Sequence, residues 1–365
     1  DMIFGNVTLT DATSFDSGAN AMTIADIDSD GNAITLESGT TMGIGEIADI
    51  SGGVTLTDAG GQATFLALGS GVTGDILVSD SNGVDFDGAV NAGTITLTNT
   101  TGTVAFNSTL DADDLVTADN AYNLSLLGDT TIAQQVDMVN TGTVTLGDGG
   151  ETLEFNGGLS FSGGTNSSLG GTIQSSDDDI NFGTGTAALA ATTIVDTNGG
   201  NLVFGGDITG VANDLTLISQ SGTIGVTGAA TGLGAVTLQE NVATSTGSVT
   251  FNGNLTADSL VTFARNYDVS LLEDVTITQA TTFNNNSSQT ITLGDEFADV
   301  LVFAGGLDVA GNATVSMGGQ FSTTGGGADF DLGTGATTLS AATTIDTSAG
   351  GGLTNITFGG TLDGT

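Results

Sequence analysis

The fold is decided by a stretch that reads Val84-Asp-Phe86, then Val104-Ala-Phe106, Leu124-Ser-Leu126 and Val144-Thr-Leu146, with the same interval from each triplet to the next. Each triplet is an apolar residue, a small or polar residue and a second apolar residue. Short alternating segments rich in Val, Ile, Thr and Phe predict β-strands. Clusters of Gly, Asn and Asp separate these segments, as turns require.

The same pattern returns later in the chain, at nearly the same interval, as Val249-Thr-Phe251, Val269-Ser-Leu271 and Ile291-Thr-Leu293. An antiparallel sandwich and a parallel solenoid both contain short, evenly spaced strands. The constant spacing of the same apolar pair favours the solenoid, because equal windings place each triplet over its predecessor, about 4.8 Å away. The sequence therefore predicts an all-β solenoid rod with coils of about 20 residues.

A longer repeat contains the shorter one. Thr101-Gly-Thr-Val-Ala-Phe-Asn107 matches Thr246-Gly-Ser-Val-Thr-Phe-Asn252, and Tyr122 matches Tyr267 at the same offset. Long-period self-similarity is typical of repeat architectures. We predict divergent coils over residues 1–100, one repeat unit over 101–245 and a second copy over 246–365, all in one continuous solenoid. Neither end reads as a cap, which predicts a mature product or a segment of a longer chain.

Several phrases resemble large bacterial surface proteins built of β-strand repeats, similar to filamentous-haemagglutinin-type adhesins and autotransporter passengers. They are Val203-Phe-Gly-Gly-Asp-Ile208, Val249-Thr-Phe-Asn-Gly-Asn-Leu255 and Thr357-Phe-Gly-Gly-Thr-Leu362. The resemblance covers most of the chain. It implies a right-handed parallel β-helix, secretion, and an adhesive or scaffolding role, and it implies no catalytic residue. Members of that group usually contain Lys and Pro, whereas this chain has neither.

Composition excludes several classes of function. The chain has 42 acidic residues, one basic residue (Arg265), no His and no Cys, and a formal net charge of −41. Nucleic-acid binding needs Lys or Arg to neutralise phosphates. Disulfides, Cys/His zinc sites and His- or Cys-dependent nucleophiles cannot be built. No apolar stretch approaches the length of a membrane span. The scarcity of trypsin-type cleavage sites favours an extracellular or cell-surface location.

One motif predicts a metal site. Residues 26–37 read D-I-D-S-D-G-N-A-I-T-L-E, which satisfies the calcium-loop pattern D-x-D-x-D-G-x5-E. Alternating carboxylates can converge on a hard cation, and the final Glu can bind it with both oxygens. The flanking residues predict strands rather than helices, so a solvated acidic turn is the alternative. The predicted calcium ligands are Asp26, Asp28, Asp30, Asn32 and Glu37.

Two other patterns leave alternatives open. An asparagine follows the aromatic residue at Asn107, Asn156 and Asn252. These asparagines either form an inward or turn-lining amide ladder or simply occupy turn positions. Thr-x-Thr pairs, as at Thr290-Ile-Thr292, suit either a lattice-binding face or an exposed strand face. The second interpretation is favoured because the pairs are irregularly spaced.

The sequence therefore predicts a non-enzymatic extracellular shaft, a segment of a fibre, stalk or adhesin that stacks end to end on copies of itself or on the rest of a longer chain. Calcium is the single cofactor that the motifs suggest. The alternative is a surface-layer or adhesin module that recognises carbohydrate, including surface glycans. The remote alternative is a polysaccharide-cleaving β-helix enzyme, which two Tyr and no Trp disfavour, since sugar clefts use aromatic platforms.

Overall fold

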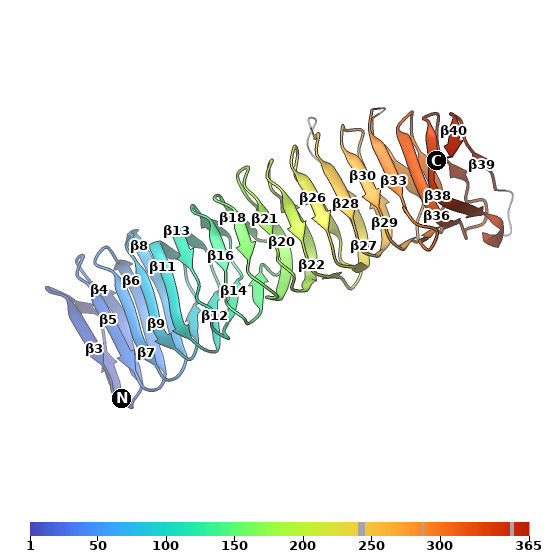
Figure 1. The fold of residues 1–365 in the computed structure, drawn as a ribbon. Coiled ribbons are helices and arrows are strands. Elements are labelled where there is room, and N and C mark those ends of the chain that lie inside the picture. The colour runs from blue at the N-terminus through green and yellow to red at the C-terminus, as the bar shows by residue number, and fades with distance from the viewer. Residues whose placement is uncertain (240–244, 287, 351–353, 365) are drawn as a thin grey trace. The chain divides into compact units, whose positions relative to one another are not determined.

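The structure is a computed structural model that describes residues 1–239, 245–286, 288–350 and 354–364 (Figure 1). In this part of the chain nearly all regular structure is β-strand, with one short 3₁₀ turn at Ser348–Gly350. The strands run parallel and stack in a solenoid of about 17 turns with about 21 residues per turn. The predicted all-β parallel solenoid and its coil length are confirmed.

Contacts divide the chain into two compact units, Asp1–Ser176 (unit 1) and Asp177–Thr365 (unit 2). This division falls inside the first repeat copy that the sequence predicts. Compactness and sequence repetition are different properties, so the boundaries near residues 100 and 245 stay a prediction. Each unit is a β-solenoid in its own right, and each is described separately.

Unit 1 winds through short strands joined by tight turns. Its strands are β1 (Met2–Phe4), β2 (Val7–Thr8), β3 (Thr13–Asp16), β4 (Met22–Asp28), β5 (Ile34–Ser38), β6 (Met42–Asp49), β7 (Val54–Ala59), β8 (Ala63–Val72), β9 (Ile76–Ser81), β10 (Val84–Phe86), β11 (Val90–Thr100), β12 (Thr103–Phe106), β13 (Leu110–Val116), β14 (Asn123–Leu126), β15 (Thr130–Ile132), β16 (Val136–Met138), β17 (Val144–Leu146), β18 (Thr152–Phe155), β19 (Leu159–Phe161) and β20 (Ser167–Gln174).

Unit 2 follows the same plan. Its strands are β21 (Ile180–Asn181), β22 (Ala187–Asp196), β23 (Leu202–Phe204), β24 (Ile208–Thr209), β25 (Leu215–Ile218), β26 (Thr223–Val226), β27 (Ala230–Leu238), β28 (Ser248–Phe251), β29 (Leu255–Val261), β30 (Asp268–Leu271), β31 (Val275–Ile277), β32 (Thr281–Phe283), β33 (Thr290–Leu293), β34 (Val300–Phe303), β35 (Leu307–Val309), β36 (Thr314–Ser322), β37 (Phe330–Asp331), β38 (Thr337–Asp346), β39 (Ile356–Thr357) and β40 (Leu362–Gly364).

The core of unit 1 is a set of columns, one side chain per turn. Val84 pairs with Val104, Val104 with Leu124, and Leu124 with Val144, all in parallel register. All four side chains are buried. The rings of Phe86 and Phe106 stack one turn apart, with centroids 4.6 Å apart and planes 12° from parallel. The prediction that each triplet lies directly over its predecessor is confirmed.

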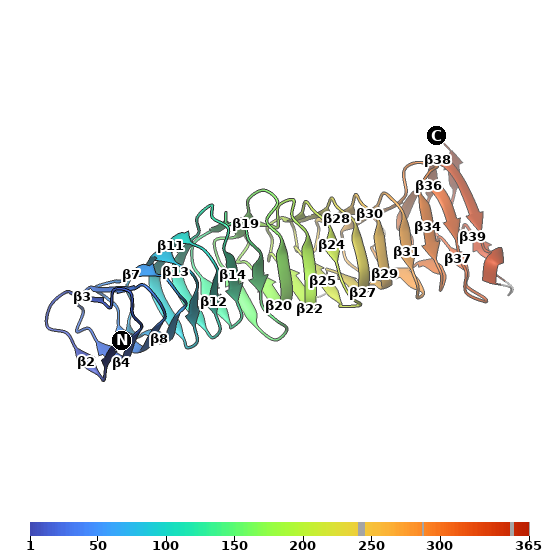
Figure 2. The same cartoon turned by 90° about the horizontal axis from the view of Figure 1, so that it is seen from below.

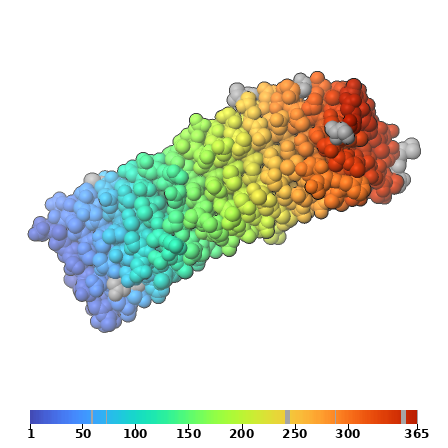
Figure 3. All heavy atoms as spheres, in the orientation of Figure 1, coloured from blue at the N-terminus to red at the C-terminus, as the bar shows by residue number. Residues whose placement is uncertain are grey.

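Unit 2 has equivalent columns, and its stacked turns are seen from below in Figure 2. Its main columns run in register from β23 through β26, β28, β30 and β33 to β36. Phe182 and Phe204 stack at 4.5 Å. In the space-filling view, neighbouring turns of each unit touch along the visible face (Figure 3). The core of unit 2 is therefore also built mainly by side chains of successive turns.

The inward amide ladder, one of the two alternatives for the Asn residues, is wrong at the positions named. Asn107 and Asn252 are exposed and Asn156 is half-buried. The Asn107 Nδ2 donates instead to the exposed carboxylate of Asp87, 2.8 Å away. The residue after the second apolar position points outward because side chains alternate along a strand. Buried amides occur elsewhere, at Asn140 and Asn285.

Candidate functional site

The predicted calcium loop spans the end of β4, a turn and β5. Asp26 and Asp28 lie on β4 with their side chains outward, on either side of buried Ile27. Asp30 and Gly31 have positive φ angles of 49° and 75°, which produce the sharp turn that the motif predicts. This local backbone geometry agrees with the sequence pattern.

Two side chains of the motif already form hydrogen bonds with other groups, and a third lies on a different strand. Asp26 accepts hydrogen bonds from Asn6 Nδ2 and from the Glu46 amide, each 3.1 Å away. The Asn32 side chain donates to the Ser29 carbonyl at 2.8 Å. Glu37 lies on β5, where it pairs in register with Asp16 of the preceding turn. The motif therefore divides between two strands.

The stacking of successive turns places two of the predicted calcium ligands beside acidic residues of the following turn. A pocket of about 360 Å³ is lined by Asp26 and Asp28 together with Glu46 and Asp49 of the following turn. Asp30, Asn32 and Glu37 do not line it. Over the described ranges, no three His, Cys, Asp or Glu side chains form a group that could hold a metal ion. Calcium binding at the motif stays a prediction.

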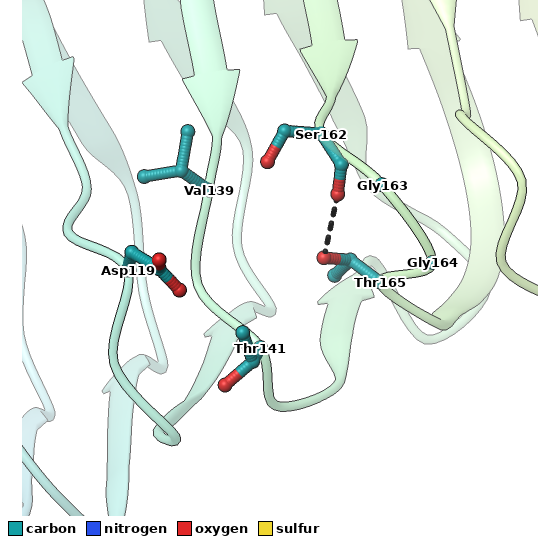
Figure 4. A pocket seen from close by; sticks show the side chains of 7 residues that line it. All are labelled: Asp119, Val139, Thr141, Ser162, Gly163, Gly164 and Thr165. Carbon is teal, nitrogen blue, oxygen red and sulfur yellow. Dashed lines mark hydrogen bonds between the residues drawn. The ribbon is translucent and has the colours of Figure 1, made fainter.

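A pocket with a volume of about 680 Å³ lies on unit 1 (Figure 4). Asp119 comes from one turn, Val139 and Thr141 from the next, and Ser162 to Thr165 from the turn after. The Thr165 hydroxyl donates to the Ser162 carbonyl at 3.2 Å and to the Asn140 carbonyl at 2.8 Å. The lining is one carboxylate, three hydroxyls, one valine side chain and the backbone of two glycines.

A second, smaller pocket of about 340 Å³ shares Val139 with the first. Its lining adds Asp114, Gln135 and Asp137, and the Thr117 hydroxyl, which donates to the Asp137 carbonyl at 2.8 Å. We call the two pockets together the unit 1 groove. Among the described residues, no aromatic or basic side chain lines this groove. It therefore offers hydrogen-bonding groups and negative charge.

A turn after β17 holds a strongly perturbed acid. The Glu151 carboxylate accepts hydrogen bonds from the amides of Asp148, Gly149 and Gly150 at 2.9, 2.9 and 3.0 Å. Burial would raise its pKa, but these amides outweigh burial and lower the pKa of Glu151 to about 2. A ring of backbone N–H groups is an anion-binding arrangement, and here the chain's own carboxylate fills it.

Unit 2 repeats this device at the equivalent turn after β33. The buried Asp299 carboxylate accepts hydrogen bonds from the amides of Asp295 and Glu296, both at 2.9 Å. Gly147 and Gly294, which begin the two turns, both have positive φ angles, of 68° and 63°. The two carboxylates thus stabilise turns of the solenoid, a role that the sequence pattern does not distinguish from that of a solvated acid.

Replacing Glu151 by glutamine should make the free energy of unfolding less dependent on pH in the acidic range. Because the folded-state pKa of Glu151 lies below its ordinary value of 4.5, its stabilisation is present above that value and is lost as pH falls to about 2. We expect Glu151→Gln to lower the free energy of unfolding by about 1–2 kcal/mol at neutral pH, after allowance for solvent screening. Urea midpoints of both proteins from pH 7 to pH 2 should converge at the acid end.

The control is Glu154→Gln. Its carboxylate accepts one side-chain hydrogen bond, from Gln174 Nε2 at 2.7 Å. An equal loss at pH 7 in both variants, or a Glu151→Gln difference that persists at pH 2, would contradict the role of the amide ring.

Acids on neighbouring turns repel one another elsewhere on the surface. Asp308 pairs in register with Asp331, and burial followed by this neighbouring charge raises the pKa of Asp308. Parallel stacking thus adds an electrostatic cost that grows with the number of acids in one column.

Comparison with known proteins adds no assignment: no protein-family model, no curated protein and no solved structure matches this chain. The fold and the surface chemistry therefore carry the functional argument. Among the helical segments described, none is long and apolar enough to cross a membrane.

The sequence analysis did not predict two buried polar sites, one around Tyr122 and one around Tyr267. Each lies at a bend of the solenoid and is called a corner below. Tyr122 and Tyr267 are fully buried, and burial raises the pKa of both phenols, that of Tyr267 to about 12. Each phenolic oxygen accepts the amide four residues earlier, from Ala118 at 3.3 Å and from Phe263 at 3.1 Å. The match of the two tyrosines at the offset of the long repeat was the signal available in the sequence.

Proposed function

We propose that this chain is a structural, non-enzymatic β-solenoid segment of an extracellular fibre, stalk or adhesin shaft. One observation carries the proposal: within each unit, turn after turn repeats the same buried columns in register. In such a fold each turn packs against the turn before it and the turn after it, so contacts between successive turns along the solenoid axis supply the stability.

End-to-end stacking is part of this proposal, and it would cover apolar side chains of the first and last described turns. Phe4 continues the column of buried Ile24 but is 42% exposed. Leu362 continues the column of buried Thr337 but is 49% exposed. Parallel strand edges at both turns can pair with another strand. We therefore propose that the first turn of one copy, or of an adjoining segment, stacks on the last turn of another.

Calcium has a physical role in this proposal. A chain with a net charge of −41 repels its own copies. Divalent cations screen such repulsion and can bridge carboxylates of neighbouring chains. The pocket with Asp26, Asp28, Glu46 and Asp49 is a place where such a cation would concentrate.

Electron microscopy of the purified chain, with calcium and with chelator, tests stacking. We expect filaments of constant width in calcium and fewer or shorter filaments with chelator. Leu362→Asp should abolish filaments, because it places a charge in the stacking interface. Val211→Asp is the control, since Val211 is an exposed residue away from either end. Monomers in every condition, or filaments that survive Leu362→Asp, would refute end-to-end stacking.

The second candidate, carbohydrate recognition, rests on the unit 1 groove with its hydroxyls and carboxylates. A glycan array with the native chain and an Asp119→Asn variant tests it. Retention of a glycan by the native chain, weakened in the variant, would support a binding module. A reducing-end assay on acidic and neutral polysaccharides tests the enzyme alternative, which cleavage would support.

A further inference from the structure

Each unit buries one asparagine amide at an equivalent corner of the solenoid. Asn140 in unit 1 is 0% exposed and Asn285 in unit 2 is 3% exposed. The offset between the two is the same as that between Tyr122 and Tyr267. In unit 1 the Asn140 Nδ2 donates to the Tyr122 carbonyl of the preceding turn at 3.1 Å, and in unit 2 the Asn285 Nδ2 donates to the Tyr267 carbonyl at 2.7 Å.

The other half of each amide has no partner. Among the described residues, four buried side-chain atoms have no hydrogen-bond partner, and two of them are Asn140 Oδ1 and Asn285 Oδ1. Exchanging the amide nitrogen and oxygen would not help, because Oδ1 would then face the tyrosine carbonyl, acceptor against acceptor. The same orphaned acceptor in both copies indicates a property of the corner rather than of one site.

The threonine hydroxyl at each corner already donates a hydrogen bond to a backbone carbonyl. In unit 1 the Thr117 hydroxyl donates to the Asp137 carbonyl and accepts the Val139 amide at 2.9 Å. In unit 2 the Thr262 hydroxyl donates to the Thr282 carbonyl at 3.3 Å and accepts the Asn284 amide at 2.8 Å. A buried carbonyl oxygen without a donor is costly and rare in native proteins. A donor from outside the chain would satisfy each of these two oxygens.

Water fits this requirement better than a cation. Neither corner presents a carboxylate among the contacts given above, and a calcium ion would need six or more oxygen ligands. Buried water molecules commonly satisfy polar groups that the protein leaves unpaired. We propose that each corner binds one internal water molecule, which donates a hydrogen bond to Asn140 Oδ1 in unit 1 and to Asn285 Oδ1 in unit 2.

A high-resolution crystal structure of the full chain tests the proposal directly. We expect an ordered water peak about 2.7–3.1 Å from each Oδ1, with displacement parameters similar to those of the surrounding protein. A protein donor on either Oδ1, a metal ion at the site, or no solvent peak at both sites would overturn it.

Water deuteron magnetic relaxation dispersion tests it in solution, because long-lived internal waters raise the dispersion amplitude. Asn140→Leu and Asn285→Leu should each remove the contribution of one water, and the double variant that of two. Asn107→Leu is the matched control, since Asn107 is an exposed amide, and should leave the amplitude unchanged. Equal amplitudes in all folded variants would contradict the proposal, and if a variant does not fold, the crystal structure of the native chain decides.

Discussion

Gly45→Ala is expected to destabilise unit 1 severely, whereas Gly43→Ala, earlier on the same strand β6, is expected to have little effect. A Cβ atom on Gly45 would lie 1.3 Å from the Ala25 carbonyl oxygen of the preceding turn. A Cβ atom on Gly43 would meet nothing within 4 Å. Since both glycines lie on one strand, the two substitutions have similar effects on strand propensity and differ mainly in this contact.

The register explains why Gly45 has no space. Ile24 pairs with Ile44 and Asp26 pairs with Glu46, so Ala25 and Gly45 lie between two fixed pairs. Relief of the clash requires the backbones of two turns to separate, and the Glu46 amide would then lose its bond to Asp26. Overpacking of this kind costs about 3 kcal/mol or more.

Urea denaturation monitored by circular dichroism measures both variants. We expect a large fall in the midpoint for Gly45→Ala and a change in the free energy of unfolding within about 0.5 kcal/mol for Gly43→Ala. Equal midpoints for the two variants would show that the turns of unit 1 are not stacked in the register described.

Phe106→Ala is the second substitution with a large expected effect. Phe106 is 1% exposed, and its ring stacks on that of Phe86 in the preceding turn. Removing it leaves a cavity inside a narrow core, with a loss of about 3–5 kcal/mol in the free energy of unfolding. Phe106→Leu should cost less, because leucine fills part of the volume and already occupies this column at Leu126.

The control for Phe106 is Phe297→Ala. Phe297 is 53% exposed, so its removal should change the free energy of unfolding by no more than about 0.5 kcal/mol. The same urea experiment compares them. A loss at Phe106 no greater than that at Phe297 would mean that the predicted core columns do not hold the fold together.

The candidate site was less predictable than the fold. The motif at residues 26–37 named Asp26 and Asp28, which line an acidic pocket, but it gave no sign of Glu46 and Asp49, which complete that pocket. Glu37 follows the turn onto β5 and stacks on Asp16, so its spacing in the motif does not bring it to that pocket. A linear motif assumes a local loop, whereas in a solenoid the nearest neighbours of a side chain lie one full turn of chain away.

The sequence by itself determined the strand type, the coil length and the buried positions, because an apolar pair repeated once per winding can bury both members when windings of equal length stack. Only the tertiary structure decided which polar groups meet across turns. Asn107 and Asn140 are the same residue type, yet one is exposed and the other is enclosed against Tyr122. That difference depends on how each turn directs its side chains and on what the preceding turn places beside them, and no local pattern specifies either.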